Sequence, residues 1–495
     1  MLSAIPDLLA RRAGLSAESA ALEDGATGRT MTYRELDRRA SLAAGMMRAR
    51  GVGEGDRVGI LCRNRIAFFE ILFGCARLGA ILVPLNWRMP AAELQPLVDH
   101  CSPVLLFHGR EDRATVTALA GCPAAIGLDD EYERAMAAAV PAPPRPQWPS
   151  GGTWYLLYTS GTTGRAKAVI YTFGMAVANY VNIGAAIDIR SADVTANFLP
   201  LFHTAGINLH ALPTLIQGGR VIVLPAFDAE RMVALIEAER LDTVFAVPTV
   251  YQALLDHPRF AAAPLHRVRH WGCGGAPLPD ALVHRSRAAG IRICAGMGMT
   301  ETGPTAFLAS PAEAWERPGS VGRPQLLVGA RAVDGEGRDV ADGEVGDLLF
   351  AGPAVTPGYW NDPEATRAAF TADGWLRTGD LARRDGDGCW YIAGRRKDMF
   401  ISGGENVYPA EIENVLAAHP AVSEAAVVAA PHPVWGEVGR AFIQLAAGRP
   451  RPPEMELDAF CRTRLAPYKV PQSFEFVPDL PRTAAGKVQK HLLAG

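Results

Sequence analysis

The sequence lacks the features that would take it out of the ordinary globular class. It has 49 lysines and arginines against 52 aspartates and glutamates, a net charge of −3, and no long basic run. A strong positive field, which proteins use to hold nucleic acid or anionic membranes, is therefore missing. No uncharged apolar run reaches ~18 residues, and the start lacks the basic and apolar regions of a secretory signal. We expect a cytoplasmic protein that binds no nucleic acid and does not insert into a membrane.

Cysteine never occurs in a paired spacing. The eight cysteines are scattered along the chain, and no Cys-x-x-Cys is present. Disulfide frameworks and zinc sites need clustered or paired cysteines. We therefore interpret them as buried thiols in a reducing compartment. No repeat of fixed period is present either, and the sequence does not indicate the oligomeric state.

The length and the patterning predict several units. At 495 residues the chain is too long for one core, since a domain has ~100–200 residues. Residues 32–50 have helical apolar spacing, with Thr32 and Glu35 placed as a capping box. A strand at 57–62, a helix at 67–78 and a strand at 80–84 give the alternation of a parallel sheet. Further strands are expected near 194–198, 220–224, 243–247 and 291–295.

The composition changes towards the C-terminus. From about residue 335 to 394, short strands with Gly/Asp turns predict a β-rich unit. The last hundred residues predict a separate unit with a helix at 409–417, a strand at 424–430 and a helix at 454–464. Residues 394–398, Gly-Arg-Arg-Lys-Asp, lie between the two units and form either a plain turn or a hinge.

Residues 158–167 are the most informative stretch. They combine hydroxyl side chains, two glycines and a lysine directly after an apolar run. Glycine lets backbone N–H groups converge on an anion, the hydroxyls add donors, and the lysine adds a positive charge. The spacing differs from that of the Walker loop. By itself the stretch is either a polyphosphate-binding loop or a polar surface turn.

Further motifs follow this loop in a fixed order. They are residues 199–206, 274–279, 298–301, 358–360, 377–380, 394–398, 404–413 and 481–487. Together they resemble the core motifs of the adenylate-forming superfamily, which includes acyl-CoA synthetases, peptide-synthetase adenylation domains and firefly luciferases. The likeness runs from about residue 10 to the last lysines, and it is greatest to acyl- and aryl-CoA ligases.

The resemblance implies a fold and a domain organisation. The expected class is α/β, with a large N-terminal domain of doubly wound sheets, a small β-rich subdomain and a small, mobile α+β C-terminal domain. The N-terminal adenylation domain would span residues 1–394, with the β-rich subdomain at about 335–394. A hinge at 395–398 would precede the mobile domain at 399–495.

The resemblance also implies an enzyme, an AMP-forming acid–thiol ligase. A small carboxylic acid would attack the α-phosphate of ATP, pyrophosphate would leave, and the acyl-adenylate would pass its acyl group to CoA. ATP, Mg²⁺ and CoA are the expected cofactors, and positioning and charge neutralisation are the enzyme's main tasks. Two alternatives stay open. The acceptor is instead a carrier-protein thiol, an amine or another nucleophile, or the chain is a non-catalytic nucleotide- or acyl-binding protein.

By the same resemblance, the nucleotide has ligands from several motifs. Glu301 corresponds to the Mg²⁺ ligand and Thr300 to a donor to the α-phosphate, and a simple helix cap is the alternative for this pair. Asp380 matches the aspartate that accepts the ribose hydroxyls, and Arg395 the arginine near ribose and phosphate; an exposed ion pair is the alternative. The β- and γ-phosphates would be held by Thr159, Ser160, Gly161, Thr162, Thr163, Gly164 and Lys167. The rest of the nucleotide-binding wall would be Gly274, Gly275, Ala276, Met297 and Gly298.

The C-terminal unit supplies the remaining expected residues. Lys487 matches the lysine that bridges the attacking carboxylate and the α-phosphate, and Lys397 matches the hinge position about which the unit rotates. Gly404 and Trp435 correspond to positions that border the CoA site, although Trp435 is alternatively a core residue.

The acid is the least determined partner. His203 resembles the histidine that lines the carboxylate site of acyl- and aryl-CoA ligases, and it is alternatively a hydrogen-bonded core residue. Amino-acid-activating relatives carry an aspartate near residues 199–210, and none occurs here.

The sequence departs from the family pattern in a few places. Met297 stands where an aromatic residue usually covers the adenine, and a thioether covers a ring face with less shape specificity. Ala166 and Ala168 replace the usual proline and glycine around Lys167, and Ala295 replaces a frequent amide residue.

Overall fold

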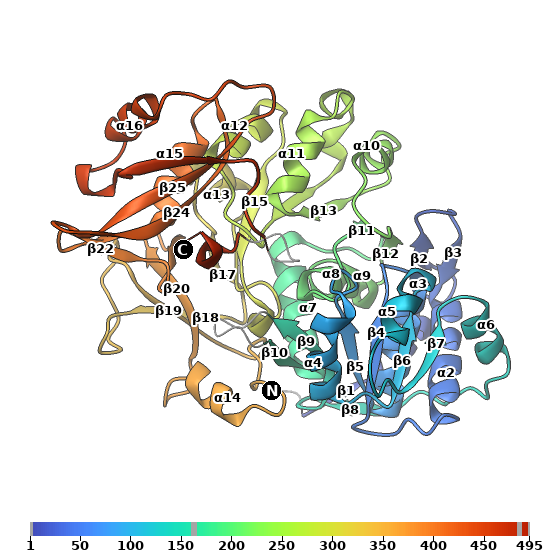
Figure 1. Ribbon diagram of the computed structural model, residues 1–495. Helices are drawn as coiled ribbons and strands as arrows, with labels where there is room; N and C mark the ends of the chain where they lie inside the picture. The colour runs from blue at the N-terminus through green and yellow to red at the C-terminus, as the bar shows by residue number, and fades with distance from the viewer. Residues whose placement is uncertain (1–2, 160–165, 483–487, 494–495) are drawn as a thin grey trace.

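The computed structural model describes residues 3–159, 166–482 and 488–493 (Figure 1). Within these residues the chain forms five sheets, of two, six, nine, four and five strands. The mixed α/β class predicted from the sequence is confirmed. The two-stranded sheet, β1 (Ala4–Pro6) with β8 (Gln147–Pro149), pairs the start of the chain with the proline-rich connector.

The six-stranded sheet carries the expected parallel alternation. Its order is β10-β9-β5-β4-β6-β7, with β9 and β10 joined as an antiparallel hairpin at one edge. Every residue of β5 is buried, as expected for a parallel strand covered on both faces. The strands are β4 (Arg57–Leu61), β5 (Ile81–Leu85), β6 (Leu105–His108), β7 (Ala124–Gly127), β9 (Thr153–Thr159) and β10 (Lys167–Thr172).

The nine-stranded sheet has a parallel centre and antiparallel strands at both edges. Its order is β17-β16-β15-β14-β13-β11-β12-β2-β3. The strands are β2 (Ala20–Asp24), β3 (Thr30–Thr32), β11 (Val194–Asn197), β12 (Arg220–Val223), β13 (Thr243–Ala246), β14 (His270–Cys273), β15 (Ile293–Met297), β16 (Phe307–Leu308) and β17 (Arg323–Pro324). The sequence patterning did not predict β14.

Helices pack between and around these two sheets. Thr32 caps α2 (Tyr33–Arg48) in the predicted capping box, with Glu35 N 3.2 Å from Thr32 Oγ1 and Thr32 N 2.7 Å from a Glu35 carboxylate oxygen. The other helices are α1 (Leu8–Leu15), α3 (Ile66–Leu78), α4 (Ala91–Cys101), α5 (Arg113–Thr117), α6 (Asp130–Ala137), α7 (Phe173–Ile187), α8 (Thr204–Asn208), α9 (Ala211–Gln217), α10 (Ala229–Glu237), α11 (Pro248–Asp256), α12 (Asp280–Ala288) and α13 (Pro311–Glu316).

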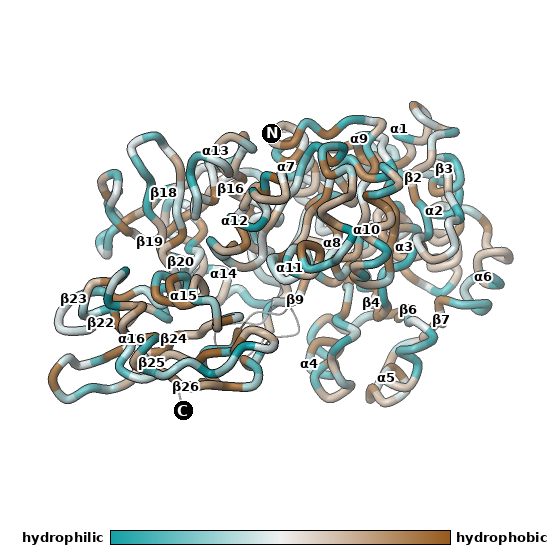
Figure 2. Tube along the Cα trace, turned by 90° about the horizontal axis from the view of Figure 1, so that it is seen from above, coloured by the Kyte–Doolittle hydropathy of each residue, from teal (hydrophilic) through white to brown (hydrophobic). Residues whose placement is uncertain are grey.

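The main core lies between the two large sheets. Helix α3 contacts β5 on one side and β2 on the other, and nearly all its side chains are buried. Gly74 allows α2 to approach, because a Cβ there would lie 3.1 Å from the Ala43 Cβ. Figure 2 shows the apolar parts of the trace gathered around α3, α8 and α9. This packing fixes the two sheets relative to each other.

A four-stranded antiparallel sheet follows in the chain. It runs from β18 (Gly329–Val333) through β19 (Gly346–Ala351) and β20 (Leu376–Arg384) to β21 (Trp390–Arg395), with α14 (Pro363–Ala369) between β19 and β20. Phe307 of the nine-stranded sheet stacks on Trp390 with ring centroids 5.2 Å apart. The β-rich sheet is therefore packed against the edge of the larger one.

The C-terminal part has its own five-stranded sheet and its own core. The strands are β22 (Phe400–Ser402), β23 (Glu405–Val407), β24 (Val422–His432), β25 (Gly436–Leu445) and β26 (Ser473–Val477), and the helices are α15 (Pro409–Ala417) and α16 (Glu454–Arg462). Its core includes Phe400, Ile412 and Leu457. In Figure 1 this part, coloured orange to red, lies beside α12. Helix α15 contacts both α12 and β21.

All eight cysteines are free, and seven of them are buried. Burial raises the pKa of the Cys101 and Cys461 thiols to about 11, which makes them poor nucleophiles. The interpretation of the cysteines as buried thiols is confirmed. Among the described residues, no helix is both long enough and apolar enough to cross a bilayer.

Candidate active site

The β9–β10 hairpin holds the ends of the predicted phosphate loop. Thr159 ends β9 and Lys167 begins β10, and the two residues are paired across the strands. The Thr159 hydroxyl donates to the Lys167 carbonyl at 3.5 Å. Five residues predicted for this loop lie outside the described residues: Ser160, Gly161, Thr162, Thr163 and Gly164.

Lys167 and Glu301 meet at one tyrosine. The Lys167 Nζ lies 5.0 Å from the centroid of the Tyr359 ring, and the Tyr359 hydroxyl donates to Glu301 Oε1 at 2.9 Å. Burial and the Glu301 charge raise the pKa of Tyr359 above its usual value, so the phenol remains a donor. Tyr359 therefore links the end of the predicted phosphate loop to the predicted metal ligand.

The carboxylate of Glu301 is buried and firmly placed. Glu301 is 6% exposed and lies in the short 3₁₀ helix η4 (Thr300–Thr302). The Thr356 N–H donates to the Glu301 carbonyl at 2.8 Å, and the Tyr171 hydroxyl donates to the Gly303 carbonyl at 2.9 Å. The Glu301 side chain accepts its hydrogen bond from Tyr359, whereas Met299 and Thr302 form the cap of η4.

Segment 358–360 lies alongside β10 because its backbone bonds to that strand. The Trp360 N–H donates to the Ala168 carbonyl at 2.8 Å, and the Ile170 N–H donates to the Gly358 carbonyl at 3.1 Å. This pairing places Tyr359 over Lys167. The sequence identified residues 358–360 as a motif but gave Tyr359 no role, because its partners lie far away in the chain.

Glycines shape the predicted nucleotide wall. A Cβ at Gly298 would lie 1.8 Å from the Pro304 carbonyl oxygen, so only glycine fits there. Gly275 has a φ of +83°, in the left-handed region that favours glycine, and it lies with exposed Ala276 just after β14. Gly274 is buried. Met297 ends β15 and packs against the apolar cluster around Phe307.

The two predicted ribose ligands contact each other. Asp380 on β20 and Arg395 on β21 are register partners, and Arg395 Nε lies 2.7 Å from Asp380 Oδ1. The Asp380 side chain is 9% exposed and the Arg395 side chain 38% exposed. The pair is therefore not the exposed surface ion pair that was the alternative interpretation.

His203 lies at the start of α8, where it is partly buried. Its ring is 4.5 Å from the Phe202 ring, centroid to centroid. The preceding loop is held by Asn64, which donates to the Leu199 carbonyl at 2.8 Å and accepts from the Leu201 N–H at 3.1 Å. Sequence reasoning missed Asn64, because its side chain bonds to residues more than 130 positions away.

Two basic side chains flank Trp87 near this loop. The guanidinium carbons of Arg63 and Arg88 each lie 5.0 Å from the Trp87 ring centroid, and the ring of Trp87 is 6.3 Å from that of Phe202. Burial lowers the pKa of Arg88 from its usual value. Cation–π contacts of this kind favour both guanidinium groups at the Trp87 ring.

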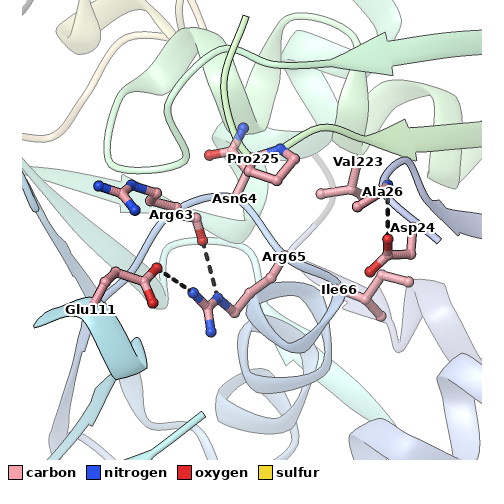
Figure 3. A pocket seen from close by; sticks show the side chains of 9 residues that line it. All are labelled: Asp24, Ala26, Arg63, Asn64, Arg65, Ile66, Glu111, Val223 and Pro225. Atoms are coloured by element: carbon pink, nitrogen blue, oxygen red, sulfur yellow. Dashed lines mark hydrogen bonds and ion pairs between the residues drawn. The ribbon is translucent and has the colours of Figure 1, made fainter. Parts of the chain in front are cut away.

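A cavity of about 370 Å³ opens on the other side of Asn64 (Figure 3). Arg65 donates to Glu111 at 2.6 Å, and Asp24 accepts from the Ala26 N–H at 2.9 Å, so much of the wall's charge is already partnered. The lining residues are Asp24, Ala26, Arg63, Asn64, Arg65, Ile66, Glu111, Val223 and Pro225. None of the predicted site residues lines it.

The predicted C-terminal residues lie on a different sheet. Trp435 is 47% exposed, so the core alternative is wrong for it, and its carbonyl accepts from the Gly403 N–H at 2.9 Å. Gly404, beside it, has a φ of +90°. The structure thus brings Gly404 and Trp435 together at the edge of the five-stranded sheet.

Lys397 lies exposed in the turn between β21 and β22. On one side of it, Arg396 pairs with Asp347 of β19, with Arg396 Nε 2.5 Å from Asp347 Oδ1. Lys487 lies outside the described residues. The segments on either side of it are anchored to the C-terminal unit: Arg482 pairs with Glu424, and Lys490 Nζ lies 2.6 Å from Glu413 Oε1.

Comparison with known proteins gives matches along almost the whole chain. The family model described as AMP-binding enzyme matches residues 9–360, and the model of the AMP-binding enzyme C-terminal domain matches residues 411–487. Feruloyl-CoA synthase of an Amycolatopsis species is 42% identical over 480 residues, which cover 97% of this chain and 96% of that protein. Indoleacetate–CoA ligase of Aromatoleum aromaticum is 36% identical over 491 residues, which cover 95% of each chain.

Solved structures agree with these matches. The o-succinylbenzoate-CoA synthetase MenE of Bacillus subtilis, in complex with its acyl-adenylate intermediate, is similar with a TM-score of 0.90 at 31% identity, covering 99% of this chain and 98% of that one. The same enzyme in complex with ATP and a magnesium ion is similar with a TM-score of 0.90 at 31% identity, covering 99% of each chain.

Proposed function

The chain belongs to the AMP-binding enzyme family, and we propose that it activates an aromatic carboxylic acid with ATP and transfers the acyl group to CoA. The acid–CoA ligase activity is that of its relatives. The observation that carries the proposal for this chain is the buried Glu301 carboxylate, joined through Tyr359 to Lys167 at the end of the phosphate loop.

The reaction has two steps. A carboxylate oxygen of the acid attacks the α-phosphorus of ATP, the bond to the β-phosphate oxygen breaks, and pyrophosphate leaves. The CoA sulfur then attacks the acyl carbonyl, the bond to AMP breaks, and the thiol proton passes to solvent. Both steps bring anionic groups together, so catalysis depends on cations and on fixed geometry.

Lys167 is suited to hold a phosphate. Its ammonium group lies over the Tyr359 ring and has no carboxylate partner in the ion pairs of the described residues. A cation held by a ring keeps its charge for an incoming anion. We propose that Lys167 and Thr159 bind the β- and γ-phosphates, together with the loop from Ser160 to Gly164, which lies outside the described residues.

The site suits Mg²⁺, because this cation takes most of its ligands from phosphate and water. Glu301 Oε1 is held by the Tyr359 hydroxyl, which leaves the second oxygen for a metal. The described residues contain no group of three or more acidic, histidine or cysteine side chains that would form an all-protein cage. Bound there, Mg²⁺ would neutralise charge on the phosphates, and Thr300 would donate to the α-phosphate.

The nucleoside would bind between β15 and the β-rich sheet. We propose that Asp380 accepts the ribose hydroxyls, with Arg395 fixing the carboxylate through their 2.7 Å contact. Gly274, Gly275, Ala276 and Gly298 would let the backbone approach the base and the phosphates. Met297 would cover the adenine, and its flexible thioether favours a less selective purine pocket.

The C-terminal unit would serve both half-reactions. We propose that Lys487 bridges the attacking carboxylate and the α-phosphate in the first, after which the unit rotates about residues 395–398. Gly404 and the half-exposed Trp435 would then border CoA, the indole stacking on its adenine. The small domain would accordingly span residues 399–495, after an adenylation domain at 1–394.

The acid is proposed to be aromatic because the relative at 42% identity is a feruloyl-CoA synthase. His203, next to Phe202, would face the carboxylate end of the acid. Since ATP and CoA are intracellular substrates and the thiols are free, we infer a cytoplasmic location.

The test is a panel of carboxylic acids assayed for pyrophosphate release with and without CoA, with products identified by mass spectrometry. The proposal expects an aromatic acid to give pyrophosphate, AMP and its CoA thioester. Pyrophosphate without a thioester would favour a carrier-protein thiol or an amine as acceptor. No release with any acid would favour a binding protein without turnover.

A further inference from the structure

Lysine is rare in this chain, and its few positions are informative. The sequence has 44 arginines but only five lysines. Arginine is therefore the default source of positive charge, and a lysine marks a position where a compact ammonium group is used in place of a planar guanidinium group. Three of the five, Lys167, Lys397 and Lys487, belong to the proposed site and hinge. The composition thus directs attention to the other two, Lys469 and Lys490.

Both of these lysines pair with α15, but they tie different segments to it. Lys469 Nζ lies 2.7 Å from Glu411 Oε2 and joins the 3₁₀ helix η5 (Pro467–Lys469) to α15. Lys490 Nζ lies 2.6 Å from Glu413 Oε1 and joins the 3₁₀ helix η6 (Lys490–Leu492) to α15. The Glu411 side chain is 45% exposed and the Glu413 side chain 20% exposed. The less exposed pair is therefore the one that holds the chain just after Lys487.

The carboxylate of Glu413 is fixed by more than the lysine. The Val427 N–H of β24 donates to Glu413 Oε1 at 2.7 Å, and α15 packs along β24. Burial raises the pKa of Glu413, the Lys490 charge and the Val427 hydrogen bond act to lower it, and the charge of Asp398 adds to the rise. A partly buried carboxylate of this kind needs its cation, because leaving one partner unpaired is costly. Glu413 therefore connects β24 and η6 close to the hinge residue Asp398.

The residues on either side of the 483–487 segment are held against the C-terminal sheet. Arg482 and Val488 form an antiparallel β-bridge, and Val488 packs against the apolar cluster that includes Val428 of β24. Val488 is bonded directly to Lys487, and Lys490 follows two residues later. The backbone immediately after Lys487 is therefore anchored by an apolar contact at Val488 and by an ion pair at Lys490.

We propose that the Glu413–Lys490 ion pair positions the segment from which Lys487 reaches the α-phosphate. Both are positioning residues, since they act through Lys487. The inference rests on the proposed ligase function, with Lys487 as its catalytic lysine. A displacement of a catalytic group by about 1 Å can cost about 10²-fold in rate. Because Lys487 serves the first half-reaction, the pair matters for adenylation and not for thioester formation.

The test measures the two half-reactions separately in Glu413→Gln, which keeps the shape and an oxygen for the Val427 N–H but removes the charge. The rate of pyrophosphate exchange into ATP, with ferulate as the first acid of the panel, should fall about 10- to 100-fold. The KM values for ATP and the acid should change by less than about threefold, because the lysine acts in the transition state. Thioester formation from the synthetic acyl-adenylate should be retained, which also shows that the variant is folded.

Lys490→Met should reproduce this pattern. The double variant Glu413→Gln, Lys490→Met should be no slower in exchange than the slower single variant, because two residues that act as one pair are not additive. Lys469→Met is the matched control, since it removes an ion pair to the same helix that does not adjoin Lys487. Its two half-reactions should remain near the wild-type rates.

Three results would overturn the positioning role. They are unchanged exchange in Glu413→Gln, equal losses in both half-reactions, and a loss of exchange in Lys469→Met as large as that in Lys490→Met. The last two would mean that the ion pairs only stabilise the C-terminal unit. In all three cases the wild type still exchanges pyrophosphate, so the ligase function would stand. A wild type that exchanges pyrophosphate with no acid of the panel would instead remove the proposed function, and this inference with it.

Discussion

At the scale of single residues, Tyr359 has the most consequential contacts in the site. Its ring carries the Lys167 ammonium group and its hydroxyl holds Glu301. One side chain thus contacts both the proposed phosphate-binding cation and the proposed Mg²⁺ ligand. Because the phenol is kept protonated by burial and by the Glu301 charge, it acts as a donor throughout the neutral pH range.

Tyr359→Phe tests this role. The variant keeps the ring under Lys167 and removes only the hydrogen bond to Glu301, which is worth about 1.5–3 kcal/mol for a charged acceptor. We expect the KM for Mg·ATP to rise about tenfold while the KM for the acid changes little. Steady-state kinetics with varied Mg²⁺ checks this. A rise in the KM of the acid alone would contradict the assignment.

Lys487→Ala should remove the first half-reaction. The ammonium group is proposed to stabilise charge as the carboxylate meets the α-phosphate, and such preorganised charge is worth a factor of about 10²–10³ in rate. Adenylation, followed by exchange of pyrophosphate into ATP, is expected to fall by at least this factor. Thioester formation from a synthetic acyl-adenylate should be retained. Intact adenylation would show that Lys487 is not the catalytic lysine.

The sequence motifs proposed candidate site residues, but they did not predict the contacts that hold those residues in place. Glu301, Asp380 and Arg395 follow from motifs because their chemistry requires particular side chains. The supporting residues do not: Asn64 holds the loop before His203 from more than 130 positions away. Contacts between distant segments depend on how the sheets pack, which no local pattern encodes.

At the scale of elements, the sequence predicted a helix boundary where the residues at that boundary themselves favour the start or the end of a helix. The capping box of Thr32 and Glu35 predicted the start of α2, and the helix expected at 409–417 is α15. The β14 strand was missed, because His270 and Gly272 interrupt its apolar pattern. The order of strands in the nine-stranded sheet was likewise beyond the sequence, since parallel neighbours are joined by long crossovers.

The turn between β21 and β22 is the proposed hinge. Lys397 is exposed there, next to Arg396, which is fixed by Asp347. A proline at residue 397 would lock one φ angle and restrict the residue before it. Lys397→Pro is therefore expected to slow one half-reaction at least about tenfold and to spare the other. Separate assays of adenylation and of thioester formation from the acyl-adenylate check this.

A matched control separates the hinge from simple damage. Lys397→Ala removes the charge but leaves the backbone free, so both half-reactions should remain near the wild-type rate. If Lys397→Pro leaves both rates unchanged, the segment is a plain turn. If Lys397→Ala slows the enzyme as much as the proline does, the side chain and not the backbone is what matters.

At the scale of the whole molecule, buried histidines couple stability to pH. His210 lies at the start of α9, which packs on β11 and β12 of the nine-stranded sheet. Its Nδ1 is 3.4 Å from the hydroxyls of Thr195 and Thr243, and its ring is 6.1 Å from that of His270. Burial is the main cause that lowers the pKa of His210 to about 3 and that of His270 to about 4, with nearby Arg269 lowering the latter further. Both are therefore neutral in the folded protein.

The sign of the effect follows from these directions. An unfolded histidine has a pKa of about 6.5, so it binds a proton as the pH falls below that value while the buried one does not. Each histidine thus favours the unfolded chain increasingly as the pH falls towards 4. Asp112 acts in the opposite direction, because burial raises its pKa to about 6. Only a comparison with a histidine variant therefore isolates the contribution of one histidine to the pH dependence of the unfolding free energy.

His210→Gln is that variant, since the glutamine keeps a polar group for the two threonines and cannot be protonated. From pH 7 to pH 5, the histidine is expected to cost the wild type about 2 kcal/mol of unfolding free energy, which the variant would not lose. The melting temperature of the wild type should therefore fall further than that of His210→Gln over this range, whatever their difference at pH 7. Scanning calorimetry at both pH values measures it. Equal falls would mean that His210 takes up its proton in the folded state, with a pKa near its ordinary value.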